Sequence, residues 1–131
     1  MGGGIGAQLA TRIRKDIKVD ITLCAIGTNA VAAQRMADAG GCRGASGENA
    51  FRVSLPDVDF IVGPLGIVLP NAMMGEVTTA MAEAVLASRA RKILLPLAQS
   101  HVSIVGLTEC NLGELVDEAL LTLVKALEAE R

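Results

Sequence analysis

A glycine cluster at the start of the chain, MGGGIG, leads directly into an amphipathic helix. Ile5, Leu9 and Ile13 recur every fourth residue with charged side chains between them, which predicts a helix over about residues 5–16. In doubly wound α/β proteins, a glycine turn of this kind joins a β-strand to the helix that follows it. The sequence ahead of the turn is too short to form that strand. We therefore expect an α/β chain in which the first strand of the sheet is missing.

Strand and helix signals alternate along the rest of the chain. Apolar runs predict strands at residues 21–26, which Gly27 closes, at 59–64, which stops at Gly63–Pro64, and at 92–98. Helical periodicity predicts helices at residues 30–39, 47–55, 78–90 and 112–127. A further apolar run, 102–107, follows too closely for an intervening helix, which predicts an antiparallel hairpin. The sequence thus predicts a single Rossmann-like domain over residues 1–131. Its doubly wound sheet is mostly parallel and ends in the hairpin and a C-terminal helix.

The missing strand matters for the sheet as a whole. In both common doubly wound orders, the first strand lies in the middle of the sheet. Without it, the strands at 21–26 and 59–63 flank a vacancy, with unpaired backbone groups on the facing edges. We therefore expect that the native start lies upstream of Met1 or that the sequence is truncated. Cys24, inside the first predicted strand, is expected to be a small core residue.

The composition excludes several classes of partner. Twelve basic and 14 acidic side chains give a net charge of −2, and only 2% of the residues are aromatic, so nucleic-acid binding has no electrostatic or stacking basis. Cys24, Cys42 and Cys110 lack the spacing of metal ligands and fit a reducing cytoplasm. The apolar stretch FIVGPLGIVLP is too short and too broken to cross a bilayer, and no signal peptide opens the chain. We expect a cytoplasmic protein without membrane, nucleic-acid or metal partners.

The glycine cluster is the first candidate binding site, because backbone without side chains lets an anion approach the amides at a helix start. The cluster contains Gly2, Gly3, Gly4 and Gly6. Its letters match G-x-G-x-x-A, typical of dinucleotide sites, and also G-x-G-x-G, typical of sites for a nucleotide-like methyl donor. A tight turn that lets the helix pack closely explains the same glycines. Both interpretations stay open.

A second candidate turn follows the strand at 21–26 and contains Gly27, Thr28 and Asn29. Dinucleotide sites often place an acidic residue here for the ribose hydroxyls, and this chain does not. Thr28 or Asn29 is therefore better explained as the cap of the next helix.

The third candidate turn is the segment GASGEN, which contains Gly44, Ser46, Gly47, Glu48 and Asn49. Ser46 is the predicted N-cap of a short helix, and the amides of Gly47 and Glu48 could bind a phosphate that Asn49 orients. Glu48 equally complements the helix dipole in a structural role, and its charge would repel an anion. The functional and structural interpretations carry equal weight.

Two familiar enzyme chemistries have little support. His101 is the single histidine and lies in the predicted hairpin turn, so a Ser-His-Asp or Cys-His arrangement is not indicated. The string GGGIG resembles the glycine motif of short-chain dehydrogenases, but those enzymes use a tyrosine and this chain contains none.

Several segments resemble, in the same order, a small bacterial family known only as a domain of unknown function. They are GGGIG, IGTNAVA, GASGENA, DFIVGPLGIV, MMGEVTTAMAEA, KILLPLAQ and VSIVG. The resemblance covers essentially the whole chain and implies a Rossmann-like fold with a short apolar strand ahead of the glycine turn, which is lacking here. It implies no reaction, cofactor or catalytic residue.

We expect the chain to be a binding module for a nucleotide, a dinucleotide or another phosphate-bearing small molecule at its glycine-rich turns. The first alternative is a small enzyme acting on a phosphorylated metabolite, with Glu48 or Glu76 as general base. The second is a non-enzymatic subunit of a homo-oligomer, because the chain is 51% hydrophobic and poor in aromatic residues. The sequence assigns no catalytic residue.

Overall fold

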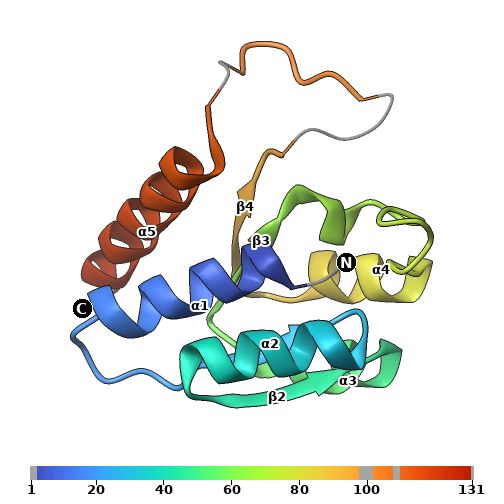
Figure 1. Ribbon diagram of the computed structural model, residues 1–131, viewed down its shortest axis with the longest axis horizontal. Helices are drawn as coiled ribbons and strands as arrows, with labels where there is room; N and C mark the ends of the chain where they lie inside the picture. The colour runs from blue at the N-terminus through green and yellow to red at the C-terminus, as the bar shows by residue number, and fades with distance from the viewer. Residues whose placement is uncertain (1–2, 98–101, 108–109, 131) are drawn as a thin grey trace.

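The computed structural model describes residues 3–97, 102–107 and 110–130, which form five α-helices and four short β-strands (Figure 1). The elements in chain order are α1 (Gly4–Asp16), β1 (Cys24–Gly27), α2 (Ala30–Gly40), β2 (Arg43–Ser46), α3 (Glu48–Ser54), η1 (Leu55–Asp57), β3 (Phe60–Pro64), η2 (Leu65–Val68), α4 (Thr79–Ala87), β4 (Arg91–Leu95) and α5 (Leu112–Ala129). The predicted mixed α/β class is confirmed.

The strands form two separate parallel pairs. β1 pairs with β2 in the register Cys24↔Arg43 to Gly27↔Ser46. β3 pairs with β4 in the register Phe60↔Arg91 to Pro64↔Leu95. Among the described residues, no strand joins the two pairs. The expectation that the strands at 21–26 and 59–63 do not pair with each other is confirmed, and the described strands do not form the continuous doubly wound sheet that the sequence predicts.

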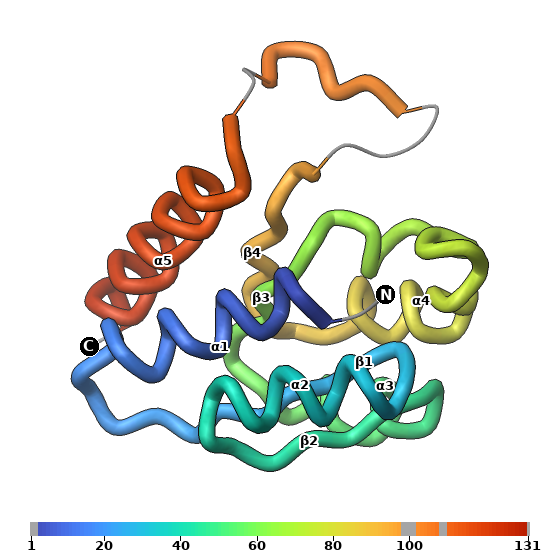
Figure 2. Tube along the Cα trace, in the orientation of Figure 1, coloured from blue at the N-terminus to red at the C-terminus, as the bar shows by residue number. Residues whose placement is uncertain are grey.

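Two clusters of buried side chains hold the strands between layers of helices. The first core cluster joins α1 and α5 to β4 and comprises Leu9, Ile13, Ile17, Ile93, Leu95, Leu115, Val116, Ala119, Leu120 and Leu123. The second core cluster joins α3, α4 and β3 and comprises Phe51, Leu55, Ile61, Val77, Met81, Ala82, Val85 and Ala90. The tube in Figure 2 shows α1 lying between α2 and α5, and α1 contacts both of these helices.

Local sequence signals account for most helix boundaries. Asn29 caps α2, because its Oδ1 accepts a hydrogen bond from the Ala32 amide at 2.8 Å. Gly41 ends α2 in the left-handed conformation that glycine adopts readily, with φ of 57°. Thr78 and Asn111 cap α4 and α5 in the same way as Asn29 caps α2.

The prediction of an antiparallel hairpin is wrong, because the second predicted strand, at residues 102–107, does not form. β4 pairs with β3 in parallel, and residues 103–107 form no strand. The turn predicted at 98–101, with His101, lies outside the described residues. The segment 102–107 instead leaves the body of the molecule as an exposed apolar arm (Figure 1). We call it the 102–107 arm.

The sequence interpretation also missed β2 and misjudged Cys24. All four residues of β2 are exposed, so no apolar pattern marks the strand. Cys24 is exposed as well, contrary to the expected core position. Cys24 and the buried Ala25 are successive residues of β1, so their side chains point to opposite faces of the strand, and the face of Cys24 is exposed at this end.

Candidate functional site

The turn after β1 forms a polar cluster with a carboxylate from a distant part of the chain. Thr28 Oγ1 donates a hydrogen bond to Glu76 Oε1 at 2.9 Å. Asn29 Nδ2 donates to the same oxygen at 2.6 Å, while its Oδ1 caps α2. Glu76 was a candidate only as a general base, and its partnership with Thr28 and Asn29 has no signal in the sequence, since 47 residues separate it from Asn29.

These hydrogen bonds determine the charge state of Glu76. The bond from Asn29, and then that from Thr28, lower the pKa of Glu76 below its ordinary value. The carboxylate is therefore ionised at neutral pH and is a weaker base than an ordinary glutamate. Because an efficient general base has a pKa near the working pH, this environment disfavours Glu76 in that role.

Glu76 is carried by a loop in an unusual backbone conformation. Asn71, Met73 and Met74 have φ of 69°, 57° and 57°, in the left-handed region that costs L-residues energy, and Gly75 follows at 88°. The Asn71 amide donates to the Val77 carbonyl at 2.7 Å and closes the loop, while Val77 itself is 1% exposed. A buried anchor thus holds the 69–77 loop against the end of β1.

The first glycine cluster serves close packing between α1 and α2. Gly3 is the N-cap of α1 with φ of 75°, and a Cβ there would lie 2.8 Å from the Ala32 carbonyl oxygen. A Cβ on Gly6 would lie 2.1 Å from Met36 Sδ. The absent side chains therefore face α2, as the packing interpretation predicts. Gly2 lies outside the described residues.

The start of α1 nevertheless keeps the properties of an anion-binding helix end. Its first turn contains no acidic side chain, and Gly3 supplies no side-chain cap. The helical hydrogen bonds begin with the Ala7 amide, which donates to the Gly3 carbonyl at 2.7 Å, so the amides of residues 4–6 precede them. The Arg35 guanidinium lies over this turn, because a Cβ on Gly4 would be 3.5 Å from Arg35 Nη1.

A shallow hollow lies beside this helix start. It has a volume of about 430 Å³, within the range of small-molecule sites. Its lining comes from α1, α2 and α5 and comprises Gly4, Ala7, Gln8, Thr11, Arg12, Arg35, Gly113, Val116 and Asp117. Arg35 was only a loose candidate from sequence, because its proximity to Gly4 depends on how α1 packs against α2.

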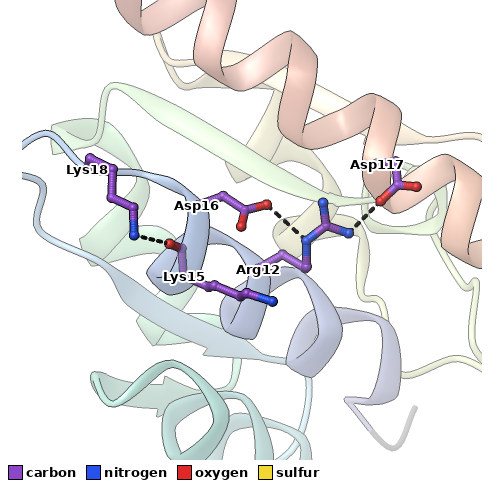
Figure 3. A network of polar contacts seen from close by, with 5 residues as sticks. All are labelled: Arg12, Lys15, Asp16, Lys18 and Asp117. Carbon is purple, nitrogen blue, oxygen red and sulfur yellow. Dashed lines mark hydrogen bonds and ion pairs between the residues drawn. The ribbon is translucent and has the colours of Figure 1, made fainter.

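Arg12, which also lines the hollow, fixes α1 to α5 (Figure 3). Its Nη1 is 2.5 Å from Asp117 Oδ1, and its Nε is 3.0 Å from Asp16 Oδ2. Hydrogen bonds to Asp117 and then to Asp16 raise the pKa of the guanidinium. Two carboxylates thus neutralise Arg12, and Arg35 also belongs to the hollow's lining.

The third glycine-rich turn differs from its predicted structure. Ser46 is the last residue of β2, opposite Gly27, and the N-cap of α3 is Gly47. The Gly47 amide donates to the Gly27 carbonyl at 3.1 Å and is thus occupied by the protein itself. A Cβ on Gly44 would lie 3.0 Å from the Ala33 carbonyl oxygen, so this glycine serves packing against α2.

Glu48 and Asn49 belong to a different surface from the start of α1. They line a hollow of about 730 Å³ between α3 and α4. Asn49 Oδ1 accepts hydrogen bonds from Arg52 Nη2 and Nε at 2.6 and 3.1 Å. The structure therefore gathers Gly27, Thr28, Asn29, Ser46 and Gly47 at one strand edge and directs Glu48 and Asn49 elsewhere.

The described part of the chain was compared with the requirements of a metal site and of a membrane-spanning helix. That part contains no group of three or more His, Cys, Asp or Glu side chains placed to hold a metal ion. Cys24 and Cys42 are free thiols, and burial raises the pKa of Cys42. None of the described helices has the length and apolarity needed to cross a bilayer.

The comparisons with known proteins yield one relationship. A family model described as "Domain of unknown function (DUF3842)" matches residues 1–128. No curated protein and no solved structure matches the chain.

Proposed function

Because the chain belongs to the domain of unknown function DUF3842, whose description assigns no activity, we propose a function from geometry alone. The chain is a binding module for a phosphate-bearing small molecule, such as a nucleotide. The ligand's phosphate lies at the start of α1, within reach of Arg35.

The observation that carries this proposal is the position of the Arg35 guanidinium over Gly4. A helix start attracts negative charge through its exposed amides and its dipole, and a guanidinium adds a charge and paired donors for phosphate oxygens. The first turn of α1 brings no acidic side chain that would oppose the ligand. The adjacent hollow of about 430 Å³ has room for the rest of a small ligand.

The starts of α2 and α3 support the choice of α1. Asn29 and the Glu76 carboxylate occupy the start of α2. The start of α3 carries Glu48, and its Gly47 amide is already bonded to Gly27. A Rossmann-like arrangement, in which the first helix start holds the phosphate, agrees with this ranking.

Thermal-shift titration with ADP and with inorganic phosphate tests the proposal. At 100 times its dissociation constant, a ligand adds about 2.7 kcal/mol, a rise in Tm on the order of 5–10 °C for a domain of this size. Arg35→Gln removes a charged hydrogen-bond donor and should weaken binding about 10- to 100-fold. Arg89→Gln, at an exposed arginine of the hollow between α3 and α4, is the matched control and should bind like the parent. No shift with either probe, or equal loss in both variants, refutes the proposal.

One surface feature favours the alternative of an oligomeric subunit. The 102–107 arm exposes four large apolar side chains, at Val102, Ile104, Val105 and Leu107, and Val105 is 98% exposed. Light scattering after size exclusion should then detect a dimer that Val105→Asp dissociates. Val31→Asp, at a 73% exposed position on α2, should leave the dimer intact. A parent chain that is strictly monomeric removes this alternative.

A further inference from the structure

The outer faces of α3 and α4 border a hollow that takes no part in the proposed phosphate site. The two helices contact each other and lie on the side of the molecule away from α5 (Figure 1). Their inner faces belong to the second core cluster, through Phe51 of α3 and through Met81 and Val85 of α4. Their outer faces line the hollow of about 730 Å³. The core thus fixes both helices, while the hollow between them opens to the surface.

The floor of this hollow is apolar and consists of small side chains. Ala80, Ala84 and Ala87 occupy positions i, i+4 and i+7 of α4, so they form one stripe along the helix. Pro56 of η1 adds an apolar side chain beside the end of α3. Small side chains allow the axis of a second helix to approach to about 8–10 Å, the distance between packed helices. The shape of the floor therefore suits a packed helix.

The rim of the hollow carries equal numbers of acidic and basic side chains. Glu48 and Arg52 belong to α3, Glu83 belongs to α4, and Arg89 follows α4 closely, and all four are exposed. Among the described residues, no ion pair joins two side chains of this rim. A peptide of one charge sign would meet like charges here. A second copy of the chain, turned about a two-fold axis, can instead set acidic side chains against basic ones.

We propose that this surface binds a second copy of the chain as a two-fold dimer. Each copy lays its α4 in the hollow of the other, so that the two alanine stripes pack together around the axis. Glu83 of each copy then reaches Arg52 of the other, which gives two equivalent ion pairs. Because α3 has seven residues and α4 has nine, the interface is small, and we expect a Kd on the order of 10 μM. We call this surface the α3–α4 face; it comprises Glu48, Arg52, Ala80, Glu83, Ala84, Ala87 and Arg89.

The dimer involves neither the phosphate site nor the 102–107 arm. Gly4 and Arg35 line the other hollow, and no residue of the arm lines the hollow of the α3–α4 face. Val105→Asp, in the arm, should therefore leave the Kd of this dimer unchanged, and so should Arg35→Gln.

Sedimentation velocity of the full chain over a concentration series tests the proposal through the Kd. Ala87→Arg places a long charged side chain in the alanine stripe and should raise the Kd at least about 10-fold. Ala129→Arg is the matched control, because both alanines are exposed and each is the last residue of its helix. A cation is favourable at either helix end, so both variants should fold. The control lies outside the hollow's lining and should keep the Kd of the parent.

A charge exchange tests how the two copies are arranged. Glu83→Arg and Arg52→Glu, each made alone, place like charges together across the axis and should each raise the Kd about 10-fold. The double variant restores opposite charges and should return the Kd to within about 3-fold of the parent. Circular dichroism checks that each variant keeps the helical content of the parent. If Ala87→Arg loses helical content, the charge exchange decides alone.

Four results would overturn the proposal. A parent chain that stays monomeric up to about 100 μM would show that the α3–α4 face does not bind a second copy. Equal Kd values for Ala87→Arg and Ala129→Arg would place the dimer interface elsewhere. A dimer that Val105→Asp dissociates would be formed by the 102–107 arm. A double variant as weak as its single variants would refute the pairing of Glu83 with Arg52. None of these results depends on phosphate binding, which Arg35→Gln tests separately.

Discussion

Replacing Gly3 by alanine should destabilise the fold whether or not a ligand binds there. Gly3 has φ of 75°, and a Cβ at this position would lie 2.8 Å from the carbonyl oxygen and 2.9 Å from the Cα of Ala32. Both neighbouring atoms belong to the backbone of α2, so no side chain can rotate away. Alanine at this position therefore combines an unfavourable backbone conformation with a steric clash that only a shift of α1 can relieve.

The two contributions can be separated, because Gly41 carries one of them alone. It has φ of 57°, and a Cβ there would meet nothing within 4 Å. The left-handed conformation costs alanine about 1–2 kcal/mol at either position. Forcing extra atoms into a packed interface costs about 1–3 kcal/mol more, and this applies to Gly3 only. We expect Gly3→Ala to lose about 2–5 kcal/mol in total.

Urea denaturation of the ligand-free protein measures the difference. With a slope of about 1–3 kcal/mol per molar urea, a difference of about 2 kcal/mol between the variants lowers the midpoint of Gly3→Ala by about 1 M relative to Gly41→Ala. Equal midpoints for the two variants would refute the packing explanation. In that case the glycine at position 3 would be explained by its conformation or by a ligand rather than by its contact with α2.

Three further predictions concern single side chains. Hydrogen bonds lower the pKa of Glu76 in the folded protein, so its charged form stabilises the fold at pH values above the unfolded pKa of 4.5, and this stabilisation is lost as the pH falls through the lower folded pKa. Urea midpoints of the parent and of Glu76→Gln, measured from pH 7 to 3, should therefore differ at pH 7 and converge in acid. Leu95→Ala, at a 2% exposed core position, should cost about 2–5 kcal/mol, whereas Leu86→Ala, at a 59% exposed position, should change stability by less than about 0.5 kcal/mol. Ser88→Ala should cost about 1–3 kcal/mol, because the buried hydroxyl donates to the Leu55 carbonyl and accepts from the Ala90 amide. Ser88→Thr keeps the hydroxyl and should lose less stability than Ser88→Ala in the same denaturation assay.

Elements with a local signature were predictable from the sequence. The apolar spacing of α1 and α5 and the Asn29 cap depend on residues within a few positions of one another. β3 ends at Pro64 as predicted, whereas β4 ends at Leu95, directly before Pro96 and three residues short of its predicted end. β2 has no such signal, since all of its side chains are exposed and it pairs with β1 at the rim of the described sheet.

The candidate site was predictable only in part, because it depends on contacts between distant segments. The turn at Thr28 and Asn29 was identified, but its carboxylate partner Glu76 comes from a loop after β3. Arg35 gains its place only through the close contact of α1 and α2. The 102–107 arm shows the opposite failure, because its residues favour a strand while none of its described residues beyond Val102 pairs with one.

The alternation of side chains along β3 has a thermodynamic consequence. Phe60 and Val62 contact one core cluster, and Ile61, between them, belongs to the other. Neither half of the interior can melt without exposing the strand on which the other half rests, although the strands form two separate pairs. We expect scanning calorimetry to record one cooperative peak, with the van't Hoff enthalpy equal to the calorimetric enthalpy.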